Sequence, residues 1–236
     1  MPAPYDTLES VLVMVRVRLL DSIVASGGDI LTDSAPFTLP ACNAGWRRLQ
    51  EALAVLKFKR LQAEITWSNV PAAPNADPSS QVYISWNGYG LVGGGIIPTP
   101  ILPADLIMPW KLWERPYNAT SPAQMTEMES AENGLPSAPK LNWNRLYDWR
   151  EDAIYLPGAL MTSDIRMRYA AYLNDFTATS DAVPINRAGN ALAFYICAEL
   201  TKARADLDTD GFLTAAQQAA AQLAGIDPAV PKPEAV

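Results

Sequence analysis

The spacing of apolar residues changes twice along this chain, and this change limits the possible folds more than any other feature. Between Leu8 and Ile23 apolar residues recur at steps of three and four, the period of an amphipathic helix, and a second such stripe runs from Cys42 to Leu56. From residue 61 to residue 176 apolar and polar residues alternate, as in strands with one buried face. The helical period then returns, so the sequence predicts helices near both ends and strands between them.

Capping and helix-breaking residues predict where the helices begin. Asp6 followed by Glu9 is typical of a helix N-terminus, with Asp6 as the cap. Pro40 and Pro184 suit the first positions of the second and third helices, because proline has no N–H to offer at an interior position. A last helix is expected over residues 213–223.

The alternating region predicts an antiparallel sheet with strands at 61–67, 82–86, 110–115, 124–128, 142–149, 153–156 and 164–171. Neither pair of helices can bury its apolar stripe alone. The expected fold class is therefore α+β, a helical bundle from the N- and C-terminal helices with an inserted antiparallel β region. The expected domains are 1–60 with 180–225 for the bundle, 61–179 for the β domain with a long loop at 87–104, and 226–236 as a flexible C-terminal tail.

The composition argues against several classes of function. Histidine is absent, which removes histidine-based catalytic triads and histidine-ligated metals. Cys42 and Cys197 lie far apart in helical patterns, so we expect buried thiols rather than a disulfide or a zinc site. The formal net charge of −7 disfavours binding of nucleic-acid phosphates. The apolar runs are too short to span a bilayer, so no membrane partner is expected. We also expect no cofactor.

A glycine-rich stretch matches a nucleotide-binding fingerprint by letter but not by context. Residues 88–93 read Gly-Tyr-Gly-Leu-Val-Gly, which is the GxGxxG pattern. In nucleotide-binding folds this pattern opens a helix, whereas here further glycines, isoleucines and prolines follow. We expect instead a long hairpin loop with an apolar tip that contributes little to the core.

A second pattern is similar to a calcium-binding loop. Asp206, Asp208 and Asp210 stand at alternate positions and Gly211 follows, as in an EF-hand. The twelfth position, which normally holds a bidentate glutamate, is Gln217. The favoured interpretation is an acidic turn between helices, with the three aspartates as weak metal candidates. A calcium-dependent binding module at 206–217 remains the alternative function.

Catalysis has little support in the sequence. Acidic pairs such as Glu151 with Asp152 could act as general acid and base, but no flanking pattern indicates a substrate cleft. We expect no enzyme and no catalytic residues, and an activity based on Asp, Glu or Tyr stays open as an alternative. The arginines of the alternating region are expected in cross-strand or intersubunit ion pairs: Arg145, Arg150, Arg166 and Arg168.

Five segments, in their order along the chain, carry a family resemblance. They are 5–18, beginning Tyr-Asp-Thr-Leu; 43–51, Asn-Ala-Gly-Trp-Arg-Arg-Leu-Gln-Glu; 106–116, with Leu-Trp-Glu-Arg-Pro; 149–158, Trp-Arg-Glu-Asp-Ala-Ile-Tyr-Leu-Pro-Gly; and 166–169, Arg-Met-Arg-Tyr. In this order the chain resembles the head-to-tail adaptor (connector) family of tailed bacteriophages, over about residues 5–225.

The resemblance implies a non-enzymatic structural protein of the virion neck, made in the cytoplasm of a bacterial host. Copies of such a protein form a ring, here expected to be a dodecamer, that binds beneath the portal protein after genome packaging. The ring extends the DNA channel and forms the platform for the tail or the next neck protein. Twelve copies with a charge of −7 each would carry −84, and an acidic lumen would let DNA pass without sequence-specific binding.

Two segments are assigned to assembly, the glycine-rich loop and the C-terminal tail. An apolar tip on an exposed loop is unfavourable unless a partner covers it. The resemblance implies that the tail reaches toward the portal, which leaves the loop for a neighbouring subunit or the next tail component. The expected assembly contacts are Gly93, Gly94, Gly95, Ile96, Ile97, Pro228, Val230 and Pro231.

Overall fold

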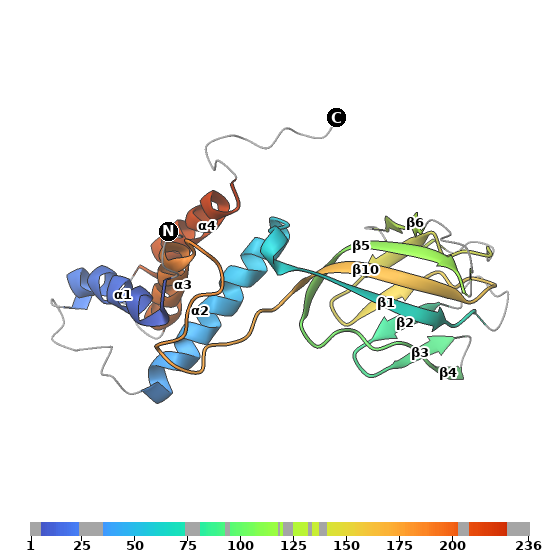
Figure 1. The fold of residues 1–236 in the computed structure, drawn as a ribbon, viewed down its shortest axis with the longest axis horizontal. Helices are drawn as coiled ribbons and strands as arrows, with labels where there is room; N and C mark the ends of the chain where they lie inside the picture. Colours follow the sequence, from blue (N-terminus) through green and yellow to red (C-terminus); the bar gives the residue numbers. More distant parts are fainter. Residues whose placement is uncertain are drawn as a thin grey trace. The chain divides into compact units, whose positions relative to one another are not determined.

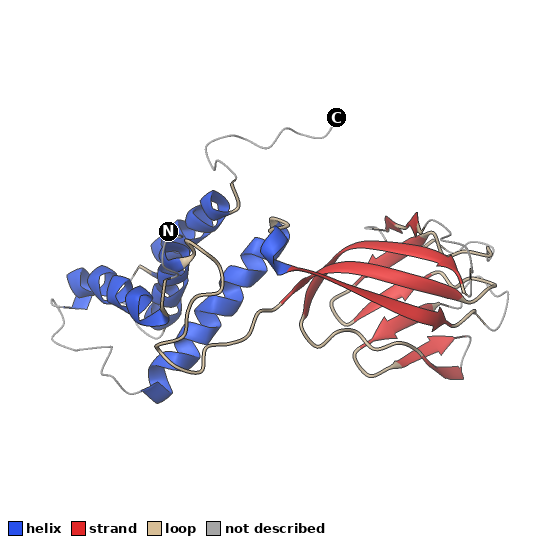
Figure 2. Cartoon of the chain, viewed as in Figure 1, coloured by secondary structure: helices blue, strands red, loops and turns tan. Residues whose placement is uncertain are grey.

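The chain folds into two compact units. The computed structural model describes residues 6–23, 35–73, 81–92, 95–117, 119, 125–131, 134–136, 141–202 and 208–225. The helical unit combines residues 1–61 with 172–236, and the β unit is the continuous stretch 62–171. Figure 1 follows the chain by colour, and Figure 2 distinguishes the helices from the strands.

Four helices and a short 3-10 turn form the described part of the helical unit. They are α1 (Leu8–Ile23), α2 (Ala35–Val55), η1 (Lys59–Leu61), α3 (Gly189–Thr201) and α4 (Thr209–Leu223). Helix α3 packs against α1, α2 and α4 and is therefore central to this unit. Gly45 allows α2 to cross α3 closely, because a Cβ at that position would lie 2.9 Å from the backbone nitrogen of Ile196.

The helices bury the apolar stripes that the sequence predicts. Trp46 is fully buried on α2, its indole N–H donates to the carbonyl of Asn174 at 3.1 Å, and its ring lies 5.5 Å from that of Phe176. A buried indole with its single donor satisfied adds apolar contact without leaving a polar group unpaired. Other fully buried side chains of this unit include Leu8, Val11, Val15, Leu19, Leu49, Leu53, Leu192 and Ile196.

The connecting segment 172–188 is held in place by side chains of α2. The amide of Asn43 accepts from the N–H of Phe176 at 2.8 Å and donates to its carbonyl at 3.0 Å. The buried Gln50 accepts from the N–H of Leu173 at 2.6 Å. Further backbone hydrogen bonds tie the segment to the residues at the start of α1. Polar side chains thus supply partners that a helix or strand would otherwise provide for this backbone.

The β unit contains two four-stranded sheets and a two-stranded hairpin. Its described strands are β1 (Gln62–Val70), β2 (Val82–Ser85), β3 (Tyr89–Val92), β4 (Gly95–Pro98), β5 (Leu106–Pro116), β6 (Thr126–Glu127), β7 (Glu129–Ser130), β8 (Leu146–Trp149), β9 (Ala153–Leu156) and β10 (Ser163–Ala171). The sheet orders are β1-β10-β5-β6 and β2-β9-β8-β7, and β3 pairs with β4. The pairing is antiparallel except between β7 and β8, which run parallel.

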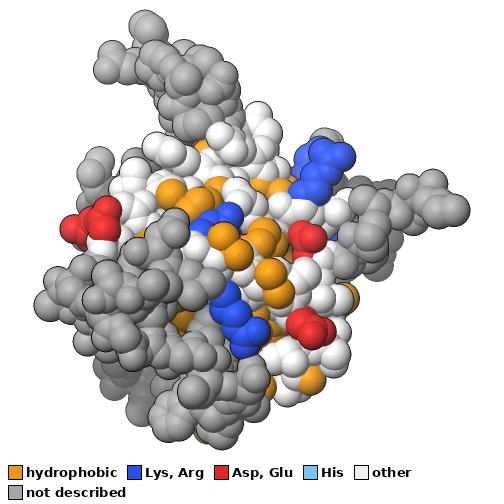
Figure 3. Space-filling view, turned by 90° about the vertical axis from the view of Figure 1, so that its left-hand side faces the viewer, with side chains coloured by type: hydrophobic (Ala, Val, Ile, Leu, Met, Phe, Trp, Pro, Cys, Tyr) orange, Lys and Arg blue, Asp and Glu red, His pale blue; other side chains and the backbone are white. Residues whose placement is uncertain are grey.

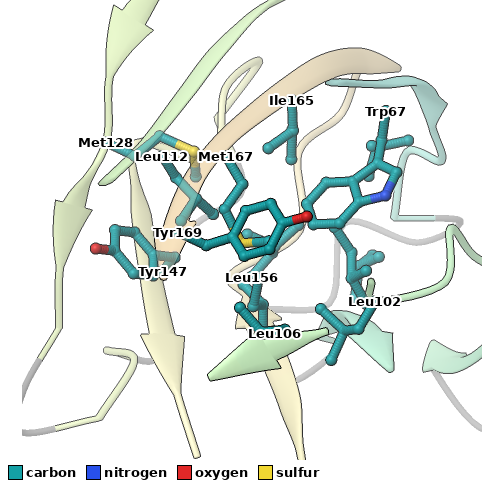
Figure 4. Close-up of a cluster of buried hydrophobic side chains, with 14 of the residues drawn as sticks. Trp67, Leu102, Leu106, Leu112, Met128, Tyr147, Leu156, Ile165, Met167 and Tyr169 are labelled. Atoms are coloured by element: carbon teal, nitrogen blue, oxygen red, sulfur yellow. The ribbon is translucent and has the colours of Figure 1, made fainter. Parts of the chain in front are cut away.

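Side chains from both four-stranded sheets meet in one hydrophobic cluster, shown in Figure 4. Trp67 of β1, Leu112 of β5, Leu156 of β9 and Met167 of β10 are all buried in it. The indole N–H of Trp67 donates to the carbonyl of Ile101 at 3.2 Å. The alternation of the sequence is explained by this cluster, because every second residue of β10 points into it.

The expected fold class, a helical bundle with an inserted antiparallel β region, is wrong. The described residues form a predominantly β-rich fold, with ten strands in three sheets and only four α-helices. The β region is also not purely antiparallel, because β7 pairs with β8 in parallel. Strands of two residues, such as β6 and β7, have no detectable period, so a search for alternation underestimates the β content.

The beginnings of two helices also differ from the prediction. Helix α2 starts at Ala35 and contains Pro40 at its sixth position, where the proline lacks the N–H for one helical hydrogen bond, so Pro40 does not mark the first position of the helix. Helix α3 starts at Gly189 rather than near Pro184. Asp6 accepts from the N–H of Gly189 at 3.2 Å, so this carboxylate serves the start of α3 instead of capping α1. Its partner lies far away in the sequence and could not be identified from local pattern.

Candidate interaction surface

An aromatic pair lies across strands β2 and β9 on the outer face of the sheet. Tyr83 and Tyr155 are directly opposite in the antiparallel register, with ring centroids 5.2 Å apart. Their chain neighbours Ile84 and Ile154 are fully buried in the hydrophobic cluster. Because successive side chains of a strand point to opposite faces, the two tyrosines face outward.

Charged side chains flank this pair. The guanidinium carbon of Arg150 lies 4.4 Å from the centroid of the Tyr155 ring, and its Nε donates to Asp148 at 2.7 Å. The Tyr155 hydroxyl donates to the Asp152 carboxylate at 3.0 Å. Desolvation, followed by the hydrogen bond to Asp152, raises the pKa of Tyr155 above its ordinary value. Tyr155 therefore stays a neutral donor in neutral solution, next to an exposed carboxylate.

The turn between β2 and β3 adds two exposed aromatic side chains, Trp86 at 43% and Tyr89 at 56% exposure. The Trp86 indole N–H donates to the Glu151 carbonyl at 3.3 Å, which places the ring beside the β8–β9 turn. The Asn87 amide oxygen accepts from the Tyr89 N–H at 3.0 Å and from the Ser85 hydroxyl at 2.6 Å. This polar network fixes the turn that presents both rings.

Gly90 is needed for this arrangement. A Cβ at Gly90 would lie 2.7 Å from Cγ2 of Thr99 and 2.8 Å from the carbonyl oxygen of Tyr83. A larger residue would therefore push β3 away from β2. The central glycine of the fingerprint thus has a packing role at a strand, and the stretch does not open a helix.

Together these side chains line an open hollow of about 440 Å³ on the β unit, here called the aromatic groove. Tyrosine and tryptophan are enriched where protein surfaces bind other proteins, because they combine a large apolar area with few rotatable bonds. The lining residues are Tyr83, Ser85, Trp86, Asn87, Tyr89, Gly90, Asp152, Ala153 and Tyr155.

A second hollow of about 480 Å³ lies beside β6, β7 and β8, and Trp143 is among its lining residues. Two of the residues that line this hollow are held by the buried carboxylate of Glu114, which accepts from the N–H groups of Asn144 at 2.9 Å and Arg145 at 2.7 Å. Arg145 has a φ of +57°, which is unfavourable for a residue with a side chain. Glu114 thus stabilises a strained turn.

The helical unit carries an exposed apolar patch of its own on α1. Val13 and Val17 stand one turn apart and are 53% and 62% exposed, while the opposite stripe of α1 is buried. Figure 3 shows hydrophobic side chains gathered on this end of the unit, with a few basic and acidic side chains among them. Both units therefore present apolar side chains to solvent.

The predicted assembly residues fall into two groups. Gly95, Ile96 and Ile97 belong to β4, which pairs with β3 inside the segment expected to be a long loop. Ile97 packs against the hydrophobic cluster of the β unit instead of standing at an exposed tip. The other predicted contacts lie outside the described residues: Gly93, Gly94, Pro228, Val230 and Pro231.

The weak metal candidates are placed only in part, because Asp206 lies outside the described residues. Asp208 is the N-cap of α4, and its carboxylate accepts from the N–H of Gly211 at 2.8 Å. Asp210 lies in the first turn of the same helix, where a negative charge is favourable. Within the described ranges, no three acidic or cysteine side chains converge on a point that could hold a metal ion.

The expectation of buried thiols is confirmed, and the expectation of cross-strand ion pairs is confirmed for one of the four arginines. Cys42 and Cys197 are fully buried free thiols, and burial raises the pKa of each to about 12. Among the strand arginines expected in ion pairs, Arg150 pairs with Asp148 two positions away in the chain, whereas Arg168 forms a cross-strand ion pair with Glu64 at 2.6 Å. Its neighbour Arg166 lies over the ring of Trp113 at 4.7 Å, a cation–π contact.

The sequence patterns do not predict the aromatic groove. Its residues come from β2, β3 and β9, and only the register of β2 with β9 brings them together. One signal was present, since Trp86 and Tyr89 bracket an Asn-Gly turn that would expose both rings.

Comparison with protein-family profiles and with curated proteins gives no match for this chain. Within the described residues, none of the helices has the length and apolar character needed to cross a bilayer.

Proposed function

We propose that this chain is a structural subunit of a phage neck, a head-to-tail adaptor that assembles into a ring beneath the portal. In this proposal the ring extends the DNA channel and forms the platform for tail attachment. The order of segments that resembles the adaptor family supports it, as does the acidic composition. The observation that carries it is that each unit exposes apolar or aromatic side chains of its own.

A closed ring needs two different surfaces on every subunit, because each copy contacts one neighbour with one patch and the other neighbour with a second patch. The exposed pair Val13 and Val17 provides one candidate on the helical unit. The β unit provides another, where Ile101 is 59% exposed and lies against Gly88, in the turn that carries the exposed rings of Trp86 and Tyr89. Burial of such exposed apolar side chains under a partner is favourable, because it removes apolar surface from water.

The excess of acidic over basic residues supports a role in lining a channel through which DNA passes. Adhesion to DNA grows with the number of phosphates that basic groups neutralise, and this chain has fewer basic than acidic residues, 18 against 25. A ring of such subunits would hold DNA weakly unless its few basic residues gathered on the lumen.

The alternative function, a calcium-dependent binding module at 206–217, gains no support from the described residues. Asp208 uses one carboxylate oxygen to cap α4, and Asp210 lies in the first turn of that helix, while Asp206 lies outside the described residues.

Light scattering of the purified chain, alone and mixed with the portal protein, tests the proposal. We expect a marginally associating protein alone and a ring on the portal after mixing. The double variant Val13→Ser with Val17→Ser should weaken assembly without unfolding the chain. The matched control Val55→Ser, on an even more exposed valine of α2, should leave assembly unchanged. A tight dimer that the portal does not alter would contradict the proposal.

A further inference from the structure

We propose that the aromatic groove of one copy binds the proline-containing segment 226–236 of a second copy. This inference rests on the proposed function, since it assigns one of the copy-to-copy contacts of the ring. It joins the two parts of the chain that the sequence associates with assembly, the glycine-rich hairpin and the proline-containing segment.

The groove has the chemistry of a site for extended proline-containing peptides. Proline-rich segments dock on surfaces lined by aromatic rings, because proline rings stack on flat apolar faces and the extended chain loses little entropy on binding. Tyr83 and Tyr155 present adjacent rings 5.2 Å apart, and Trp86 and Tyr89 extend the aromatic wall. Trp86 and Tyr155 also make hydrogen bonds that hold their rings before any ligand arrives.

The segment 226–236 has the matching features. It reads Ile-Asp-Pro-Ala-Val-Pro-Lys-Pro-Glu-Ala-Val. In the polyproline II conformation about three residues make one turn, so Pro228 and Pro231 would lie on the same face. Lys232 follows directly, and the groove offers the exposed carboxylate of Asp152. The segment therefore offers prolines for the aromatic rings and a lysine for the carboxylate of the groove.

The two copies use different surfaces in this contact, as the neighbouring subunits of a closed ring do. A segment from one copy in the groove of the next leaves the first copy's groove free for another segment, so the contact is heterologous and can close into a cycle. This assignment gives the segment to a neighbouring copy, whereas the family resemblance gives it to the portal.

Sedimentation velocity of the full-length chain at increasing concentration tests the inference. Two defective variants are used: Trp86→Ala removes the groove wall, and Pro228→Ala with Pro231→Ala removes the proline face. Each should weaken self-association about tenfold or more relative to the unchanged chain. Trp143→Ala, which alters the second hollow of the same unit, is the matched control and should associate normally.

Mixing the two defective variants gives the sharpest result. One retains its proline segment and the other retains its groove, so the mixture should form heterodimers that neither variant forms alone. In a single chain, Asp152→Lys with Lys232→Glu should restore association that each charge reversal alone weakens. A mixture that stays monomeric, or a proline variant that associates like the unchanged chain, would overturn the inference.

A parallel mixture with portal separates this inference from the proposed function. If the unchanged chain forms rings on the portal and the groove and proline variants do so equally well, the inference fails and the function stands. If the chain associates through the groove but never binds portal, the proposed function fails instead.

Discussion

The helical unit and the β unit of this protein complete their cores by different means. The helical unit gathers residues from both ends of the sequence, and side chains such as Asn43 and Gln50 hold the backbone of the segment that returns to α3. The β unit is one continuous stretch whose two four-stranded sheets share a single hydrophobic cluster. The core of the helical unit therefore depends on a few side chains whose partners lie far away in the sequence. The core of the β unit depends on the register of its strands.

The largest effect is expected from Trp46→Ala in the helical unit. Trp46 is fully buried and donates to Asn174, so its removal leaves both a cavity and an unpaired carbonyl. We expect a loss of about 3 to 5 kcal/mol in the free energy of unfolding, measured by urea denaturation. Val55→Ala on the exposed side of α2 is the control and should change little. An unchanged midpoint for Trp46→Ala would mean that the core of this unit lies elsewhere.

A smaller loss is expected from Glu114→Gln in the β unit. The carboxylate uses both oxygens to accept from the backbone of Asn144 and Arg145, whereas an amide has only one acceptor oxygen. One buried N–H is left unpaired, at a cost of about 1 to 3 kcal/mol. Thermal or urea unfolding measures this loss, and the exposed Glu127→Gln serves as control. Equal stability of the two variants would show that the strained turn does not need its buried carboxylate.

Local patterns predict some elements of the fold and miss others. The helical spacing of apolar residues in α1 and the alternation of apolar and polar residues in β10 are local patterns, so they predict both elements close to their observed bounds. The true start of α3 depends on Asp6, more than 180 positions away, and local signals could not show it. The aromatic groove depends on the register between β2 and β9, which no short window of sequence contains.

Alkaline pH should weaken both units, and one tyrosine in each contributes to this loss, in addition to the buried thiols Cys42 and Cys197 of the helical unit. Burial and the neighbouring Asp105 raise the pKa of Tyr169 in the β unit to about 12, and burial with the hydrogen bond to Glu51 does the same for Tyr172 in the helical unit. In the unfolded chain both phenols ionise near pH 10. The unfolded state therefore loses its protons first, and stability falls as the pH rises from about 10 to about 12.

Phenylalanine at either position should reduce this alkaline loss, because the group that titrates is gone. Urea unfolding at about pH 8 and about pH 11 measures it for Tyr169→Phe, Tyr172→Phe and the unchanged chain. Helical circular dichroism during unfolding should report mainly the Tyr172 change. Identical pH dependence in all three proteins would contradict the assignment of these two pKa values.

The smallest effect on folding is expected from the surface residues assigned to assembly. Val13→Ser with Val17→Ser should change the free energy of unfolding by no more than about 0.5 kcal/mol per site, since both side chains are already largely in water. Differential scanning calorimetry measures the stability of this double variant beside that of Trp46→Ala. A large destabilisation would place these valines in the core and remove them as a ring contact.

Shortening the β3–β4 hairpin is a related test with a revised expectation. Because Ile97 packs against the β-unit cluster and Gly90 fits closely over Tyr83, removing residues 90–97 should lower the melting temperature. Ile97→Ser alone should lower it less, and thermal unfolding orders the two variants. An unchanged melting temperature after the deletion would show that the hairpin does not contribute to the stability of the β unit.

Hydrogen exchange on the free chain and on the chain mixed with portal protein tests the central proposal, that this protein assembles through the exposed surfaces of its two units. The account predicts that assembly adds protection to the β2–β3 turn, the β8–β9 turn and the exposed side of α1, while the cores of both units keep the same exchange rates. Unchanged exchange at all three surfaces, with new protection confined to other parts of the chain, would contradict it.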